Sequence, residues 1–458
     1  MLTRLHHEPA QPSHASTRGR DGQCSLTPRR AWAPRGPGPA RPGTPSAAEP
    51  VDISIARQPV FDRYRQVFGY ELLFRPGPGG RSAGVDGDHA TARVIVDSLL
   101  RFGIGRITGG KRAFINFTRD TLVRGYATLF PREQIVVEIL EDVEQDPEVY
   151  DACRELKQAG YLLALDDFVC EDWANPLLRF ADIIKVDFRA TAPAARAELP
   201  RALAYRKLRS LAEKVETRAE FDEAIELGFT YLQGFFFSRP LVLAGRDIPG
   251  FRLRYLEVLR EVNRPQVDFA ELEAIIKREP SLLYKLLTYI NAVAFGFRAR
   301  ITSVRQALML LGEDAVKKWA SIVALAGLTQ DQPSETVVTS LVRARFCEQL
   351  APHAGLEERA QELFFLGLFS LLDALTGRPM PEVVADLPLA DDIKLALLGN
   401  RTRPFDVLSC VLAQERGDWA AVELYAAKLR VPEAEVARRY LEAVAWGTES
   451  FLAISATS

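Results

Sequence analysis

Short runs rich in β-forming residues alternate with amphipathic helical stretches between Val51 and about Pro240. Two of these helical stretches end in Gly160 and Gly228, as helix C-caps commonly do. Alternation of this kind predicts parallel strands joined by crossover helices. The number of strand–helix units predicts that the sheet closes into a TIM-like β/α barrel. The clearest strand-like runs begin at Arg112, Gln134, Tyr161, Asp182, Lys207 and Tyr231.

The strand-like runs disappear after about Phe251, and helical patterns continue to about Phe451. Apolar residues there recur at spacings of three and four, which predicts an α-helical bundle or superhelix. We therefore expect a β/α barrel over residues 51–241, followed by an all-helical domain over residues 250–458. Residues 240–249 are the expected linker.

Residues 1–50 are rich in proline and arginine and contain little that a core could bury. This composition predicts a disordered tail. Its arginines could contact a nucleic acid, but a plain tail or a misassigned start codon is the simpler interpretation.

The charge of the chain is nearly balanced, with 58 Lys and Arg against 60 Asp and Glu among 458 residues. A general binder of nucleic-acid polymers or anionic membranes would be strongly basic, so the balance argues against both. Every apolar run is shorter than the roughly 20 residues of a membrane helix, and no signal peptide is evident. The five cysteines form no CxxC pair, and their odd number fits reduced thiols. We expect a cytoplasmic protein.

Each predicted barrel strand carries a polar residue near its C-terminal end. A buried polar group costs free energy unless it is paired, so its presence needs a reason. The C-terminal rim of a β/α barrel is also where such folds place their chemistry. The members of this predicted polar ring are Glu71, Asn116, Glu138 with Glu141, Asp166 with Asp167, Lys185, Glu213 and Gln233.

The ring combines carboxylates and amides without a His or Cys, and its carboxylates would repel one another without a cation. Oxygen ligands of this kind predict a hard ion, Mg²⁺ or Mn²⁺. Two such ions could activate a water and hold a phosphodiester during in-line attack. Lys185 could orient that water or stabilise the developing negative charge. Any single member could equally be a helix cap or a surface ion pair, but one member on each strand favours a site.

The strands also carry a series of short motifs in a fixed order. They are Gln58-Pro59 in RQPVFD, GYELLFR ending at Arg75, Asn116, Glu138-ILE-Glu141, Asp166-DF, Ile184-KVD, Ala212-EKVE and Gln233-GFFFSRP. On these motifs, residues 52–241 resemble the EAL-type phosphodiesterases, which open the bacterial second messenger cyclic di-GMP to linear pGpG with two divalent metals.

The resemblance implies a role for each matched residue. Gln58 and Arg75 would hold the substrate, and two Mg²⁺ or Mn²⁺ ions would be bound per site. Catalytic and supporting roles would fall to Lys185, Glu213, Gln233 and Glu141. The implied metal ligands are Glu71, Asn116, Glu138, Asp166 and Asp167. A homodimer through the barrel is also possible in such a protein.

Two positions depart from the family pattern. Leu72 replaces an alanine of the naming motif, which is a mild change. Active members usually follow the Asp-Asp-Phe motif with Gly-Thr-Gly and a serine pair, but Val169-CEDWAN follows here. Loss of the glycines removes backbone freedom from this loop. The complete ring favours an enzyme, whereas the altered loop favours a catalytically inactive cyclic di-GMP receptor or a protein-interaction scaffold.

The helical half resembles the HDOD module, an HD-hydrolase-like fold without its metal site. The resemblance lies in residues 280–312, with Asn291, Ile301 and Gly312 at the usual positions. Where an HD enzyme has its His-Asp pair, this chain has Ser370 and Leu371. Since His353 is the only histidine of this half, we expect no metal hydrolysis there. The order of the two domains resembles a class of bacterial signalling proteins, and an unknown protein partner is expected to bind the helical half.

Overall fold

The computed structural model describes residues 53–76, 99, 102–168, 173–238, 250–264, 266–278, 309–328, 334–385 and 387–455. The chain divides into two compact units, Met1–Glu49 and Pro50–Ser458, and every described residue belongs to the second. The predicted tail, the predicted linker at 240–249 and most of the HDOD stretch, residues 280–308, lie outside the described residues.

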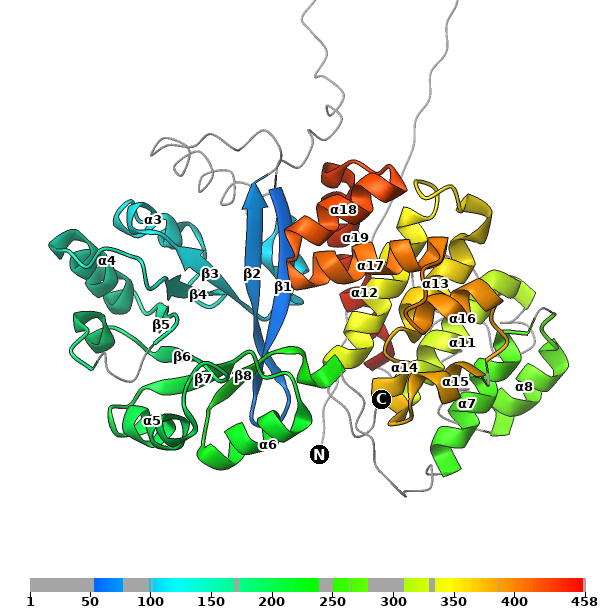
Figure 1. Cartoon of the computed structure of the whole chain (residues 1–458), viewed down its shortest axis with the longest axis horizontal. Coiled ribbons are helices and arrows are strands. Elements are labelled where there is room, and N and C mark those ends of the chain that lie inside the picture. The colour runs from blue at the N-terminus through cyan, green and yellow to red at the C-terminus, as the bar shows by residue number, and fades with distance from the viewer. Residues whose placement is uncertain are drawn as a thin grey trace, which may run out of the picture. The chain divides into compact units, whose positions relative to one another are not determined.

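Eight strands form a closed barrel in the order β1 to β8 (Figure 1). β1 runs antiparallel to both of its neighbours, and the remaining pairs are parallel. The prediction of parallel strands is therefore wrong for β1. Only a tight turn joins it to β2, which is too short for a crossover. The strands are β1 (Ile53–Asp62), β2 (Val67–Pro76), β3 (Arg112–Phe117), β4 (Ile135–Ile139), β5 (Leu162–Leu165), β6 (Ile183–Asp187), β7 (Arg209–Glu213) and β8 (Tyr231–Gln233).

The helices between the strands begin and end with local signals that the sequence provides. The side chain of Asp146 accepts a hydrogen bond from the amide of Val149 at the start of α4. Thr217 and Glu220 form a capping box at the start of α6, and Gly228 ends that helix in the left-handed conformation. The elements are α2 (Ile104–Thr108), α3 (Arg119–Val123), η1 (Tyr126–Leu129), α4 (Pro147–Gln158), η2 (Pro176–Arg179), α5 (Pro193–Tyr205), α6 (Arg218–Leu227) and η3 (Phe235–Ser238).

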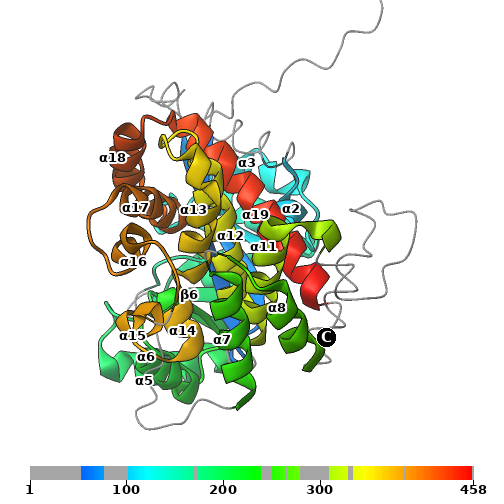
Figure 2. The same cartoon turned by 90° about the vertical axis from the view of Figure 1, so that its right-hand side faces the viewer.

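The second half of the chain is helical wherever it has regular structure among the described residues, as predicted. Its central helix is α12, which packs against α13 and α19 and is buried on most of its surface (Figure 2). The helices are α7 (Gly250–Val262), α8 (Phe269–Arg278), α11 (Glu313–Gly327), α12 (Ser334–Leu350), η5 (Glu357–Arg359), α13 (Ala360–Phe369), α14 (Leu372–Thr376), α15 (Met380–Ala385), α16 (Asp391–Leu397), α17 (Arg403–Arg416), α18 (Trp419–Leu429) and α19 (Glu433–Ser455).

The helical half contacts the barrel along its first strand. Helices α17 and α19 lie against β1 (Figure 1). Gln414 of α17 donates a hydrogen bond from Nε2 to the carbonyl oxygen of Ile55 at 2.9 Å. Leu441 of α19 belongs to the same hydrophobic cluster as the outer face of the barrel. The strand that departs from the parallel pattern therefore also contacts the helical half.

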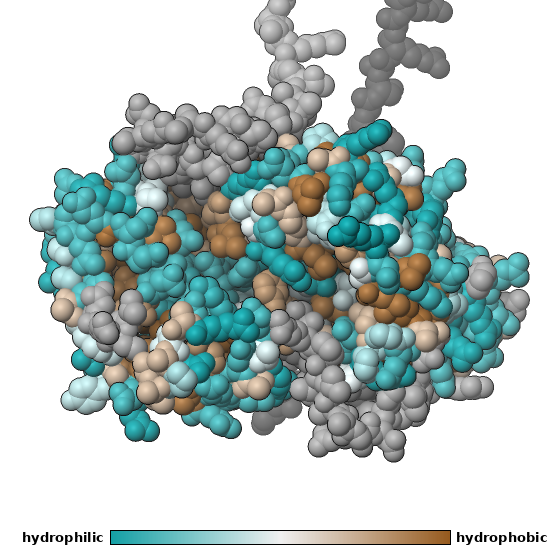
Figure 3. All heavy atoms as spheres, viewed as in Figure 1, coloured by the Kyte–Doolittle hydropathy of each residue, from teal (hydrophilic) through white to brown (hydrophobic). Residues whose placement is uncertain are grey.

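The face of the molecule in Figure 3 is predominantly polar. Figure 3 shows hydrophilic residues over most of one face, with apolar residues between them in separate patches. Among the helices described, none has both the length and the apolar character needed to cross a membrane.

Candidate active site

The interior of the barrel is built in two layers. The lower layer is the apolar cluster of Val60, Phe114, Val136, Ala164, Ile183, Leu211 and Tyr231. Side chains along a strand alternate between its faces, so the residue two positions later points into the barrel again, one layer higher. For the six members from β3 to β8, that position is occupied by the polar ring: Asn116, Glu138, Asp166, Lys185, Glu213 and Gln233. The alternation of the strands thus produces a polar mouth above an apolar floor.

Lys185 lies at the centre of this mouth and is only 1% exposed. Its ammonium group forms ion pairs with carboxylates from four other strands or strand ends. It pairs with Glu138, with Glu213 at 2.8 Å, with Asp166 at 3.0 Å and with Glu71 at 3.4 Å. One positive charge therefore faces four carboxylates, and the site has an excess of negative charge.

Burial and charge perturb the titration of these groups. Burial lowers the pKa of Lys185, but the surrounding carboxylates, above all Glu138, hold that pKa well above its ordinary value. Burial raises the pKa of Glu138 well above its usual range, against the opposing effect of Lys185. Burial also raises the pKa of Glu213 to about 7. Glu138 and Glu213 therefore resist ionisation unless more positive charge is supplied.

Several acceptors in the mouth lack a donor. In the described part of the chain, Asn116 Oδ1, Glu138 Oε2 and Gln233 Oε1 are buried without a hydrogen-bond partner. Such atoms are rare in folded proteins and need an explanation. Carboxylate oxygens of Asp166, Asp167 and Glu213 also lie within 4.8 Å of one another. The unpaired acceptors and the surplus negative charge together fit a divalent cation with oxygen ligands.

Gln233 of β8 links the side chains of Glu71 and Gln58. Gln58 of β1 lies opposite Glu71 of β2 in the antiparallel ladder. The side chain of Gln233 donates from Nε2 to Glu71 Oε2 at 2.5 Å and to Gln58 Oε1 at 3.3 Å. The structure therefore brings Gln58 and Gln233 into the ring and orients one oxygen of Glu71.

The backbone is strained where the Asp-Asp pair turns out of β5. Asp167 is exposed and has φ of 42°, in the left-handed region that non-glycine residues rarely adopt. Its amide donates to Asp166 Oδ1 at 3.1 Å. Strain of this kind often accompanies functional sites. Of the altered loop at 169–175, residues 169–172 lie outside the described residues, and Asn175 at its end accepts a hydrogen bond from the amide of Leu177 at the start of η2.

The structure does not bring Glu141 into the ring. Glu141 is exposed in the turn after β4, and within the described ranges no hydrogen bond or ion pair joins it to a ring residue. It follows Glu138 by three positions, so alternation directs it away from the interior, and the strand has already ended.

Arg75 also lies apart from the ring, against the helical half. It donates from Nη1 to the carbonyl oxygen of Trp419 at 3.0 Å, and it pairs with Glu423 and Glu433 at 3.5 and 3.4 Å. Four residues of extended strand separate Arg75 from Glu71, which is roughly 13 Å. The pairing of β2 with β3 ends at Glu71, and at Arg75 the strand pairs with β1 alone.

Asp187 and Lys214 stand in the Ile184-KVD and Ala212-EKVE motifs, but the sequence predicted no role for them at the rim. Asp187 Oδ1 accepts hydrogen bonds from the amides of Arg189 and Ala190, and Oδ2 pairs with Lys214 at 2.5 Å. These contacts shape the turn after β6. The signal in the sequence was the position of Asp187 two residues after Lys185, which places it on the same strand face.

The comparisons with known proteins agree with this architecture. The EAL domain model matches residues 110–240, and the HDOD domain model matches residues 248–376. A Bacillus subtilis protein named Uncharacterized protein YuxH is 37% identical over 402 residues, which is 86% of this chain and 98% of the relative. The chain belongs to the EAL–HDOD family.

A second relative of this EAL–HDOD protein is the Cyclic di-GMP phosphodiesterase CdgJ of Vibrio cholerae. The two are 36% identical over 398 residues, which is 86% of this chain and 92% of CdgJ. Among solved structures, the calcium and cyclic di-GMP complex of Klebsiella pneumoniae BlrP1 is 22% identical, over 41% of this chain and 56% of that chain, with a TM-score of 0.35. That score is too low to add to the assignment.

The family confirms the predicted order of domains, and the closed barrel followed by helices confirms the predicted fold class. The boundaries 51–241 and 250–458 stay predictions, and so do the roles of the individual ring residues.

Proposed function

We propose that this EAL–HDOD protein is a divalent-metal-dependent phosphodiesterase that hydrolyses cyclic di-GMP to linear pGpG. The observation that carries the proposal is the mouth of the barrel, where buried carboxylates exceed the single charge of Lys185 and acceptors lack donors. The name of the Vibrio relative, which matches almost its full length, supports the same activity.

The residues of the ring fit the metal that this activity needs. A bound Mg²⁺ or Mn²⁺ would lower the pKa of a coordinated water and neutralise charge on the phosphodiester. Two ions per site are expected from the family resemblance. The proposed ligands are Glu71, Asn116, Glu138, Asp166 and Asp167, and Glu213 lies close enough to Asp166 and Asp167 to join them.

The other residues of the mouth orient the proposed ligands and supply or balance charge. Gln233 donates to Glu71 and is itself held by Gln58, so the carboxylate of Glu71 is oriented. Glu213 and Asp166 fix the ammonium of Lys185 above the apolar floor. From there Lys185 would orient the attacking water and stabilise the negative charge that develops on the phosphate, a contribution of the kind made by one positioned electrostatic group.

A second candidate is a receptor that binds cyclic di-GMP without hydrolysing it, or a scaffold for a protein partner of the helical half. The position of Arg75 favours this alternative, because the residue proposed to hold substrate is instead bonded to Trp419. The altered loop after Phe168 points in the same direction.

Calorimetry distinguishes these candidates. Cyclic di-GMP brings two phosphates to an acidic mouth, so the Coulomb energy opposes binding without metal. The proposal predicts weak binding in EDTA and tight binding with Ca²⁺ or Mn²⁺. Tight binding without pGpG in Mg²⁺ or Mn²⁺ would support the receptor, and failure to bind under every condition would leave the scaffold.

A further inference from the structure

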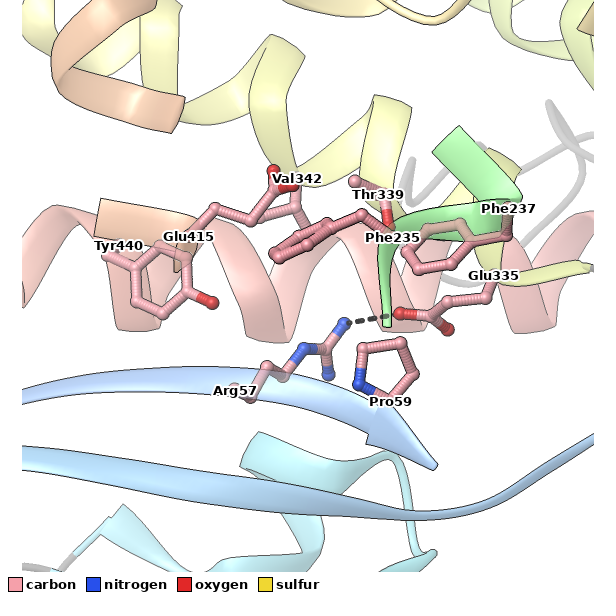
Figure 4. A pocket seen from close by; sticks show the side chains of 9 residues that line it. All are labelled: Arg57, Pro59, Phe235, Phe237, Glu335, Thr339, Val342, Glu415 and Tyr440. Atoms are coloured by element: carbon pink, nitrogen blue, oxygen red, sulfur yellow. Dashed lines mark ion pairs between the residues drawn. The ribbon is translucent and has the colours of Figure 1, made fainter. Parts of the chain in front are cut away.

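A buried polar contact joins the barrel to the helical half at the side of the first two strands. Figure 4 shows Arg57 of β1 and Glu335 of α12 pointing toward one another, with aromatic rings of η3 beside them. Side chains from β1, η3, α12, α17 and α19 line this contact. Its charges are buried, as those of the barrel mouth are, but it lies outside the barrel interior.

Glu335 is the centre of this contact and is only 3% exposed. Its Oε2 accepts a hydrogen bond from the hydroxyl of Tyr70 at 2.6 Å, and its Oε1 pairs with Arg57 Nη2 at 3.7 Å. Arg57 also donates from Nη1 to the carbonyl oxygen of Ile107 at 2.6 Å, and its guanidinium lies 4.4 Å from the centre of the Tyr70 ring. Buried charges need partners of this kind, and removing one partner leaves the other uncompensated.

The partners of Glu335 are the immediate neighbours of ring residues. Tyr70 precedes Glu71 on β2, and Arg57 precedes Gln58 on β1. Successive side chains on a strand point to opposite faces. Glu71 and Gln58 therefore face the mouth, whereas Tyr70 and Arg57 face α12. Glu71 and Gln58, which point inward, are thus each bonded through the backbone to an outward residue, Tyr70 or Arg57, whose side chain contacts Glu335 of the helical half.

Gln233, the third residue linked to Glu71 and Gln58, is also connected to the contact around Glu335. Gln233, which holds Glu71, ends β8, and η3 follows after Gly234. Phe235 and Phe237 of η3 line the contact with α12. A side chain at Gly234 would meet the carbonyl oxygen of Val215 at 1.9 Å, so only glycine fits where the chain passes from β8 into η3.

We propose that Glu335 is a positioning residue for the barrel site: by holding Tyr70 and Arg57 it fixes Glu71 and Gln58, so metal affinity in the barrel depends on the docking of α12. This inference rests on the proposed function, since it takes Glu71 as a metal ligand. Supporting partners of metal ligands commonly contribute a factor of ten or more to affinity.

The test uses two mild substitutions in the full chain. Tyr70→Phe removes one hydroxyl and keeps the ring beneath Arg57. Glu335→Gln keeps the shape and the acceptor but removes the charge. Titration of the wild-type protein and both variants with Mn²⁺ should show a dissociation constant raised about tenfold in each variant. The double variant should bind Mn²⁺ only slightly more weakly than the single variant with the lower affinity, because both changes disrupt the same contact between Tyr70 and Glu335.

A matched control comes from the same helix. Glu348→Gln removes a carboxylate of α12 that pairs with Lys318 and Arg345 inside the helical half. This variant should bind Mn²⁺ as the wild-type protein does. Saturating Mn²⁺ should also restore turnover in Tyr70→Phe, which damage to the fold would not allow.

The outcomes separate this inference from the function on which it rests. Unchanged Mn²⁺ affinity in folded Tyr70→Phe would overturn the positioning role and leave the function standing, even where Glu335→Gln fails to fold. Weakened affinity in the variants, together with no pGpG from the wild-type protein, would support the positioning role and overturn the function. A wild-type protein that does not bind Mn²⁺ would overturn both.

Discussion

Two clusters of buried charge, one in each half of the molecule, differ in how well their groups are paired. In the helical half, Arg343 donates to both carboxylate oxygens of Glu415 at 2.7 and 2.6 Å and to the hydroxyl of Ser370 at 3.1 Å. In the barrel, Lys185 faces four carboxylates, and acceptors of neighbouring residues lack donors within the described residues.

The difference separates a structural cluster from a candidate binding site. The cluster around Arg343 has one cation, one anion and satisfied hydrogen bonds, so it is complete without a ligand. The cluster around Lys185 is incomplete in charge and in hydrogen bonds, as sites that bind a cation are. Ser370, which the resemblance to the HDOD module aligns with a metal ligand of HD enzymes, accepts a hydrogen bond from Arg343 in this chain.

The largest expected effect is on catalysis at Lys185. Lys185→Ala should lower turnover of cyclic di-GMP by on the order of 10², because it removes one positioned charge from the transition state. Binding of the dinucleotide in Ca²⁺ should be preserved, since the proposed ligands remain. Rates of pGpG formation and a parallel binding titration test this. Turnover near the wild-type rate would show that Lys185 only balances charge.

A substitution in the cluster around Arg343 should change the stability of the fold rather than catalysis. Glu415→Ala leaves Arg343 buried without its counter-ion, so the free energy of unfolding should fall by about 3 kcal/mol. Urea denaturation measures this change. Glu415 also lines the contact between Arg57 and Glu335 but bonds to neither of them. Mn²⁺ affinity of the folded protein should therefore fall less than in Tyr70→Phe, and an equal or larger loss would mean that Glu415 also positions the barrel site.

The smallest expected effect is on the metal-free fold. Because the pKa of Glu138 is raised in the folded protein, ionisation of this group opposes folding at neutral pH. Glu138→Gln should therefore raise the melting temperature in EDTA by a few degrees, on the scale of about 1 kcal/mol. The same variant should lose the further rise that Mn²⁺ gives the wild-type protein. A lower melting temperature in EDTA would show that the ion pair with Lys185 outweighs the burial of Glu138.

The sequence predicted the ring well because its signal is local. A polar residue two positions beyond an apolar one on a buried strand, such as Glu138 after Val136, is visible without a structure. The prediction was less complete where strands end, since Glu141 and Arg75 belong to the same motifs but lie beyond the barrel ladder. A sequence motif shows that residues occur together, but it does not show at which residue a strand stops pairing with its neighbour in the barrel.

The contacts between the halves were not predictable from the sequence. Tyr70 and Glu335 are 265 positions apart, and neither periodicity nor composition relates them. Glu335 reads in the sequence as an ordinary acidic residue in the first turn of a helix, where such residues are common. Its burial is decided by the packing of α12 against the outer face of β1 and β2.

The central claim, that the barrel mouth hydrolyses cyclic di-GMP with a divalent metal, has one most direct test. The purified full chain is incubated with cyclic di-GMP in Mn²⁺, in Mg²⁺ and in EDTA, and the products are separated by chromatography, with Glu138→Gln as the control. We expect pGpG with metal from the wild-type protein, and none in EDTA or from the variant. A folded wild-type protein that binds Mn²⁺ and cyclic di-GMP but leaves the dinucleotide intact would contradict the claim.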